Sequence, residues 1–180
     1  MPSARPKRPS ILVLGLGNTL LSDEGLGVQA LERLHASLGD ARTDIAWLDG
    51  GTMGLEALPY IEEASHLLIL DAIQTGDPPG ALVCLQDDAI PAAIARKLSM
   101  HQVALADALA MAALRGTLPT RRVLLGITPA ELDWGLTLSE VVSAQMDDLV
   151  AAAAGVLATW GSAQDAVLAD APAGGNGDSG

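Results

Sequence analysis

The chain has 180 residues, of which 49% are hydrophobic, and this composition fits one globular domain with a sizeable core. Its 22 acidic and 10 basic residues give a formal net charge of -12 at pH 7. A surface of that sign repels nucleic acid and anionic membranes, so we exclude both as main partners.

We expect the first nine residues to be an N-terminal extension rather than a secretion signal. They place Arg5, Lys7 and Arg8 before the apolar run ILVLGLG, which is too short for a signal peptide and lacks a small-residue cleavage site. No later stretch reaches the ~18 consecutive apolar residues of a membrane-spanning helix. We therefore expect a cytoplasmic protein.

Short runs typical of β-strands alternate with helical patterns along the rest of the chain. The strands are predicted over residues 10–17, 43–49, 65–73, 80–86 and 121–129. The third strand, SHLLILDAI, is apolar almost throughout, which suits a central strand covered on both faces. The fourth strand follows the third without an intervening helix, so we expect it to be an edge strand or antiparallel.

The helical patterns lie between these strands and after the last one. They predict helices over residues 24–38, 51–60, 100–115 and 138–160. Ser22 is the expected N-cap of the first helix and Gly39 its stop. We expect Pro59 to close the second helix. The pattern Thr137-x-x-Glu140 is a capping box that opens the last one.

The alternation indicates an α/β fold, a three-layer sandwich with a largely parallel five-stranded sheet flanked by helices. We assign residues 10–161 to this domain. Residues 162–180 are expected to form a disordered tail, because their composition cannot bury enough surface to become ordered.

The one cysteine, Cys84, excludes an internal disulfide and a cysteine-based metal cluster. Its place in ALVCLQ predicts a small, buried, apolar side chain.

Polar side chains gather at one edge of the predicted sheet. In α/β sheets, ligands bind outside the carboxyl ends of the parallel strands. The residues expected there, from the ends of strands or the first turns of helices, are Glu24, Asp49, Asp71 and His101. Carboxylates and an imidazole together suit a divalent transition metal such as nickel or zinc. Three protein ligands also leave a coordination position open for water or substrate.

Each of these residues has an ordinary structural explanation beside the functional one. Glu24 complements the positive end of its helix dipole, and Asp49 before two glycines suits a turn. His101 could be a simple polar residue of a first helical turn. Asp71 is harder to explain in this way, because a carboxylate at the end of a buried strand needs a partner to offset its desolvation.

The glycine-rich loop LGLGNTLLSDEGLG does not fit a nucleotide site. The dinucleotide-binding pattern G-x-G-x-x-G is met by Gly15 and Gly17, but Leu20 occupies the third glycine position. Asp23 and Glu24 then place negative charge where a phosphate would bind at the helix N-terminus. The sequence therefore argues against a nucleotide-binding site at this loop.

Five segments resemble the maturation endopeptidases of nickel–iron hydrogenases, in the family's order and spacing over residues 10–160. These segments are GLGNTLLSDEGLGV, LDGGTMGLEAL, LLILDAI, MHQVALADAL and LLGITPAEL. The resemblance implies a peptidase that removes a short C-terminal extension from the hydrogenase large-subunit precursor after nickel has been installed. It implies that Glu24, Asp71 and His101 bind nickel and that Asp49 is a further acidic residue of the site. Met100 departs from the pattern, since close relatives are expected to have proline before the histidine.

Our leading hypothesis is an endopeptidase whose three metal ligands recognise nickel carried by the substrate, with zinc or cadmium as possible surrogates. The nickel either positions the scissile bond, polarises its carbonyl or activates water. Asp49 is either a catalytic general base or a residue that orients the following GGT loop. Two alternatives stay open: a non-enzymatic nickel carrier or hydrogenase assembly chaperone, and a different hydrolase on the same fold.

Overall fold

The computed structural model describes residues 10–39, 42–94 and 100–160, and within these ranges it leaves out the side chains of 92–94 and 100–103. The strands are β1 (Ile11–Leu16), β2 (Ile45–Gly51), β3 (His66–Ala72), β4 (Leu82–Gln86) and β5 (Arg121–Ile127). The helices are α1 (Leu26–Leu38), α2 (Leu58–Glu63), α3 (Ala89–Ile94), α4 (Met100–Leu114), α5 (Glu140–Ala144) and α6 (Met146–Trp160). Two short 3-10 turns, η1 (Ser22–Gly25) and η3 (Leu55–Ala57), precede α1 and α2. The expected extension and tail lie outside the described residues.

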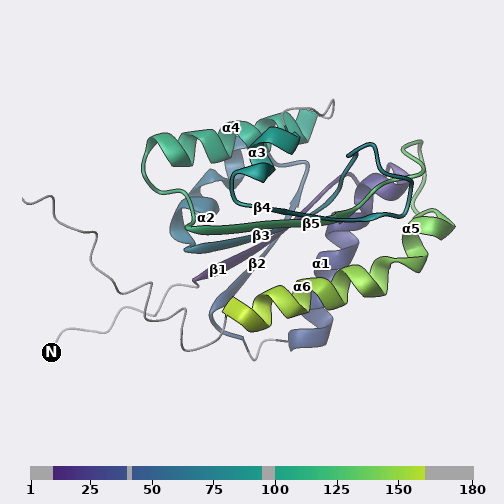
Figure 1. Ribbon diagram of the computed structural model, residues 1–180, viewed down its shortest axis with the longest axis horizontal. Helices are drawn as coiled ribbons and strands as arrows, with labels where there is room; N and C mark the ends of the chain where they lie inside the picture. Colours follow the sequence, from purple (N-terminus) through teal and green to yellow (C-terminus); the bar gives the residue numbers. More distant parts are fainter. Residues whose placement is uncertain (1–9, 40–41, 95–99, 161–180) are drawn as a thin grey trace, which may run out of the picture.

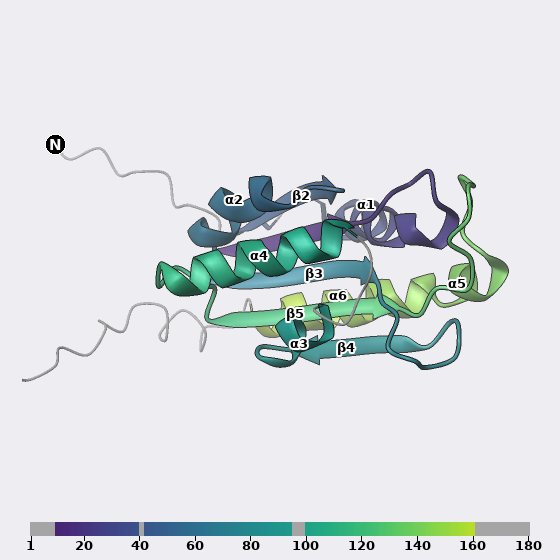
Figure 2. The same cartoon turned by 90° about the horizontal axis from the view of Figure 1, so that it is seen from above.

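The five strands form one sheet in the order β2-β1-β3-β5-β4, as Figure 2 shows from above. The first four of these are mutually parallel, whereas β4 runs antiparallel to β5. The predicted α/β sandwich with a largely parallel five-stranded sheet is therefore confirmed. The fourth strand was expected to be an edge strand or antiparallel, and β4 is both.

Helices cover both faces of the sheet, with α1 and α6 on one side and α2, α3 and α4 on the other (Figure 1). Successive residues of a strand point to opposite faces. Ile11 and Val13 of β1 thus pack in the core with α1 and α6, while Leu12 and Leu14 pack against α2 and α4. This double coverage explains why the first and third strands are apolar without alternation. None of the described helices is long and apolar enough to cross a membrane.

The start of the first helix differs from the prediction. Ser22 is not an N-cap: it lies inside η1 at a φ of 42°, and its hydroxyl donates to the carbonyl of Asp133 at 3.0 Å. The α-helix begins only at Leu26, because the chain first makes a 3-10 turn that contacts β3. Gly39 is the residue at which α1 ends, at a φ of 61°, as expected.

Two other helices also differ in their boundaries. Pro59 opens α2 rather than closing its helix, which suits a residue whose missing N–H is tolerated in a first turn. The predicted last helix is divided into α5 and α6 at Gln145. Its cap is Ser139, whose hydroxyl accepts from the backbone N–H of Val142 at 3.4 Å, and not Thr137. The short helix α3 was not predicted.

Cys84 is exposed, so the prediction of a buried side chain is wrong. On β4 only Val83 is buried, and it packs in the core with α3 and α4. The other face of this edge strand carries Leu82 and Cys84, both exposed, since the core formed by α1 and α6 does not extend over it. An apolar run cannot by itself distinguish a central strand from an edge strand.

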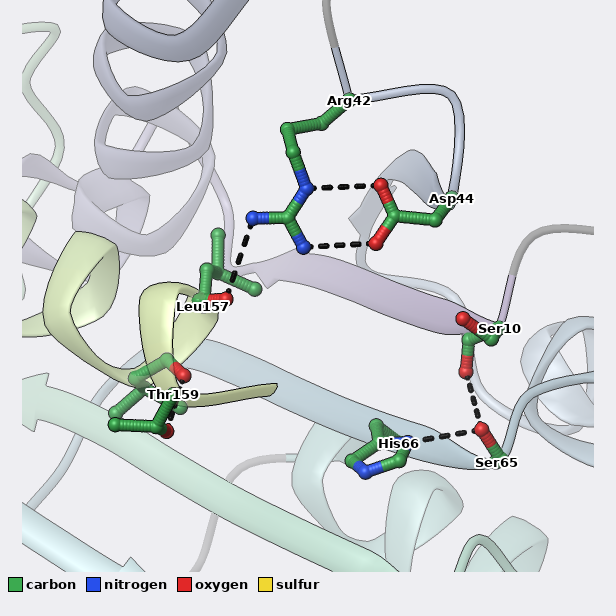
Figure 3. Close-up of polar contacts among 8 residues, drawn as sticks. Ser10, Arg42, Asp44, Ser65, His66, Leu157 and Thr159 are labelled. Atoms are coloured by element: carbon green, nitrogen blue, oxygen red, sulfur yellow. Dashed lines mark hydrogen bonds and ion pairs between the residues drawn. The ribbon is translucent and has the colours of Figure 1, made fainter. Parts of the chain in front are cut away.

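Polar contacts tie elements together at the amino ends of the parallel strands (Figure 3). Arg42 donates from Nε and Nη2 to the carboxylate of Asp44 at 2.8 and 2.7 Å, and from Nη1 to the carbonyl of Leu157 at 3.3 Å. The hydrogen bond to Arg42 lowers the pKa of Asp44, and the same bond raises the pKa of the guanidinium. Ser65 donates to the carbonyl of Ser10 at 2.8 Å, which joins the starts of β3 and β1.

Gly27 lies at a very close approach between α1 and the sheet. A methyl group there would overlap the backbone carbonyl oxygens of Leu70 and Leu16, at the carboxyl ends of β3 and β1. We expect Gly27→Ala to lower the free energy of unfolding by about 3 kcal/mol, because two strands or the helix must shift to admit it. Urea denaturation of the variant measures this loss.

Gly155→Ala in α6 is the matched control, since no described atom lies within 4 Å of its Cβ position. There we expect a gain of up to about 1 kcal/mol from helix propensity alone. Equal stability changes at the two positions would contradict the close packing at Gly27.

Candidate active site

The predicted site residues belong to segments that meet at the carboxyl edge of the parallel strands. Glu24 lies in η1, which follows β1, and Asp49 lies near the end of β2. Asp71 is the penultimate residue of β3, and the backbone of His101 lies in the first turn of α4. Residues nearly eighty positions apart in sequence thus reach one rim, as strand topology predicts.

Asp71 is buried, with 2% of its surface exposed, in the central strand of the sheet. It has the same strand parity as Leu67 and Ile69, which pack in the core on the α2 and α4 side. Its side chain therefore faces the layer that contains α4. A carboxylate at such depth is desolvated, which strengthens its attraction for a cation.

The glycine-rich loop folds closely onto itself and carries Glu24 to the rim. Gly17 has a φ of 126°, and a side chain there would overlap the carbonyl oxygen of Glu24. Its N–H donates to the carbonyl of Gly51 at 2.8 Å, so the loop is also joined to the end of β2. The glycine at this turn permits close backbone packing and does not form a phosphate cradle.

The start of α4 packs against the loop that follows β2. A Cβ at Gly54 would overlap the Cβ of Ala104, which lies one turn after His101. The backbone of His101 is therefore held beside the same rim as Asp71 and Glu24. The side chain of His101 is not among those that the structure describes, so the prediction that it is a metal ligand stays a prediction. Among the side chains that are described, no group of three or more His, Cys, Asp or Glu is arranged to hold a metal ion.

Asp49 is exposed and makes a turn contact. Its Oδ1 accepts a hydrogen bond from the N–H of Gly51 at 2.9 Å, two residues along the chain. This is the arrangement by which aspartate stabilises a turn. It supports the orienting role over the general-base role.

Asp23 was expected to place negative charge at the helix N-terminus beside Glu24, and its structural role was not predicted. It is completely buried, and its carboxylate accepts four hydrogen bonds from the segment after β5. Oδ2 accepts from the N–H groups of Ala130 and Glu131 at 2.8 and 2.9 Å and from the Ser139 hydroxyl at 2.8 Å. Oδ1 accepts from the Ser139 N–H at 2.7 Å. The acid next to Glu24 therefore fixes a loop that is distant in sequence, and no local sequence pattern around it indicates this role.

Comparison with known proteins gives consistent matches over most of the chain. The family model described as hydrogenase maturation protease matches residues 28–156. The hydrogenase expression/formation protein HupD of Rhodobacter capsulatus is 44% identical over 163 residues, covering 89% of this chain and 76% of that protein. The hydrogenase 2 maturation protease of Escherichia coli K12 is 39% identical over 140 residues, covering 76% of this chain and 84% of that protein.

Among solved structures, the hydrogenase maturating endopeptidase HybD from E. coli superposes with a TM-score of 0.78 at 35% identity. The match covers 84% of this chain and 93% of that one. These matches confirm the resemblance found in the five sequence segments and favour the peptidase over the carrier and chaperone alternatives. The chain belongs to the hydrogenase maturation protease family.

Proposed function

We propose that this protease removes the C-terminal extension of a nickel–iron hydrogenase large-subunit precursor, and that it does so after nickel has been inserted. In this proposal Glu24, Asp71 and His101 recognise the nickel ion that the precursor brings. The observation that carries it is the position of Asp71, a carboxylate buried at the carboxyl end of the central strand on the side of α4. The fold holds the backbone of His101 and the turn of Glu24 beside the same edge.

The chemistry of the three residues suits a metal that is part of the substrate. Carboxylates and imidazole are accepted by nickel, and three ligands leave further positions for groups of the precursor. Contact with the ion would fix the neighbouring peptide bond at the rim of the sheet. The ion can position the bond, polarise its carbonyl or activate a water molecule.

Asp49 is proposed to orient the loop that follows β2. Its hydrogen bond to the N–H of Gly51 holds the turn that leads to Gly54, and Gly54 packs against the start of α4. Through this packing contact Asp49 would influence the position of His101. Asp49 itself would not contact the scissile bond.

The proposed function is tested by asking whether the nickel is carried by the precursor or held by the protease. We expect the purified protein to be largely metal-free and to take up nickel, zinc or cadmium only weakly, because an open rim with three ligands from separate segments binds a free ion poorly. It should shorten nickel-loaded precursor and leave nickel-free precursor intact. Elemental analysis of the protein and intact-mass spectrometry of both precursors measure these outcomes.

Two results would contradict the proposal in different ways. A precursor whose mass stays unchanged in the presence of nickel would indicate a carrier or a protease for another substrate. A tightly held stoichiometric metal, with equal cleavage of both precursors, would indicate a conventional metalloprotease.

A further inference from the structure

Two paired loops next to the candidate site expose a group of large apolar side chains. We call this group the rim patch. Its members, with their exposed fractions, are Leu20 (49%), Leu132 (44%), Trp134 (81%) and Leu136 (73%). Exposed large apolar side chains that gather in one place are typical of protein interaction sites.

The two loops are held together by backbone hydrogen bonds. The N–H of Gly135 donates to the carbonyl of Leu20 at 3.0 Å, and the N–H of Ser22 donates to the carbonyl of Gly135 at 2.8 Å. Both views show these loops side by side at the end of the molecule near α5 (Figures 1 and 2). The rim patch is therefore one surface built from two segments over a hundred residues apart.

Asp23 makes this surface rigid. Its four hydrogen bonds hold both ends of the segment that carries Leu132, Trp134 and Leu136. A surface that is ordered before binding loses less conformational entropy when a partner arrives. The buried carboxylate of Asp23 thus keeps a segment with solvent-exposed apolar side chains in a fixed conformation. Such an ordered, exposed apolar surface favours a role in docking.

The loops of the rim patch are joined through the backbone to η1, the turn that carries the proposed nickel ligand Glu24. Glu24 directly follows Asp23 in η1, and the N–H of Asp23 donates to the carbonyl of Glu131 at 3.1 Å. A polypeptide that presents a metal ion to Glu24 would pass the rim patch.

The charges around the patch define the chemistry of its partner. No lysine or arginine occurs in residues 9–32 or 123–180, which contain both loops. The acidic residues of the paired segments include Glu24, Glu131 and Asp133. A partner segment that is apolar and positively charged complements this surface, whereas an acidic one is repelled.

We propose that the rim patch binds an apolar, positively charged segment of the large-subunit precursor beside its nickel ion, with Trp134 as the main anchor. Tryptophan is enriched among the residues that dominate binding energy at interfaces. This inference rests on the proposed function, because it names where the substrate of that function is held.

Cleavage kinetics with a nickel-loaded precursor that the wild-type protein processes test this surface. Trp134→Ala should raise KM about tenfold and change kcat by less than about twofold, since the anchor contributes to binding and not to the bond cleavage. Trp134→Phe should recover part of the loss. Leu114→Ala is the matched control: it is 84% exposed but lies at the end of α4 that is distant from His101, and its KM should equal that of the wild type.

A second pair of variants tests the charge of the partner. Asp133→Lys should raise KM at low ionic strength, and added salt should reduce the difference from the wild type. Asp88→Lys is the control for this charge change. Asp88 is exposed and follows the edge strand β4, away from the rim patch, so this variant should leave KM unchanged.

Three results would distinguish a failure of the proposed docking surface from a failure of the proposed function. Unchanged KM in both Trp134→Ala and Asp133→Lys, with active wild type, overturns the docking surface and leaves the proposed function standing. A wild-type dimer that Trp134→Ala converts to a monomer, measured by light scattering, assigns the patch to self-association instead. A wild-type protein that cleaves no nickel-loaded precursor contradicts the proposed function itself.

Discussion

Replacing Asp71 with asparagine is expected to reduce precursor cleavage by about a thousandfold or more while the protein stays folded. The amide keeps the shape of the side chain but removes the negative charge that a divalent ion requires. Because Asp71 is only 2% exposed, solvent cannot supply a replacement ligand easily. The measurement is kcat/KM on nickel-loaded precursor, with thermal unfolding as the test of folding.

Asp49→Asn is the matched control, the same change at the same edge of the sheet. Its amide oxygen can still accept the hydrogen bond from the N–H of Gly51, so we expect a loss of less than about tenfold. If Asp49→Asn abolishes cleavage as well, the general-base role is favoured over the orienting role. If Asp71→Asn processes the precursor at the normal rate, Asp71 is structural and the proposed site is wrong.

The largest expected loss of stability follows from Asp23→Ala, about 4 kcal/mol. The change removes a completely buried carboxylate and leaves the N–H groups of Ala130, Glu131 and Ser139 without their acceptor. Hydrogen bonds to a charged group contribute more than neutral ones, and a buried donor without an acceptor is costly. Urea denaturation followed by circular dichroism gives the change in unfolding free energy.

Asp49→Ala provides the comparison for stability, because Asp49 accepts one backbone N–H at an exposed turn. Its cost should be about 1 kcal/mol. If Asp23→Ala proves no more destabilising than Asp49→Ala, the segment after β5 is held mainly by other contacts. In that case the rim patch would not owe its order to this carboxylate.

The sheet could be predicted from sequence because its strands have distinctive local patterns. Apolar runs such as the one that ends at Asp71 are typical of strands buried on both faces. The missing helix before β4 indicated that this strand is either an edge strand or antiparallel. The 3-10 turn η1 could not be predicted in the same way. Its conformation, with Ser22 at positive φ, depends on hydrogen bonds to Asp133 and Gly135, far away in sequence.

The same distinction applies to the candidate site. Glu24 and Asp71 could be expected near the rim because Glu24 lies in the connection after one recognisable strand, Asp71 lies near the end of another, and the topology brings these strand ends together. The hydrogen bonds of Asp23 could not be predicted, because their donors are 107 to 116 residues away and three of the four are backbone N–H groups, which carry no side-chain signal. The burial of Cys84 was predicted wrongly for a related reason. Whether a strand lies at the edge of a sheet depends on the arrangement of all the strands and not on its own sequence.

The exposed position of Cys84 has a practical consequence for observing substrate capture. The chain contains one thiol, so a maleimide dye would attach to the unmodified protein at a single site. That site lies two strands away from β3, on the outermost strand, and outside both the rim patch and the proposed nickel ligands. With a second dye on the precursor, energy transfer would report association and product release in real time, separately from the mass change that records bond cleavage.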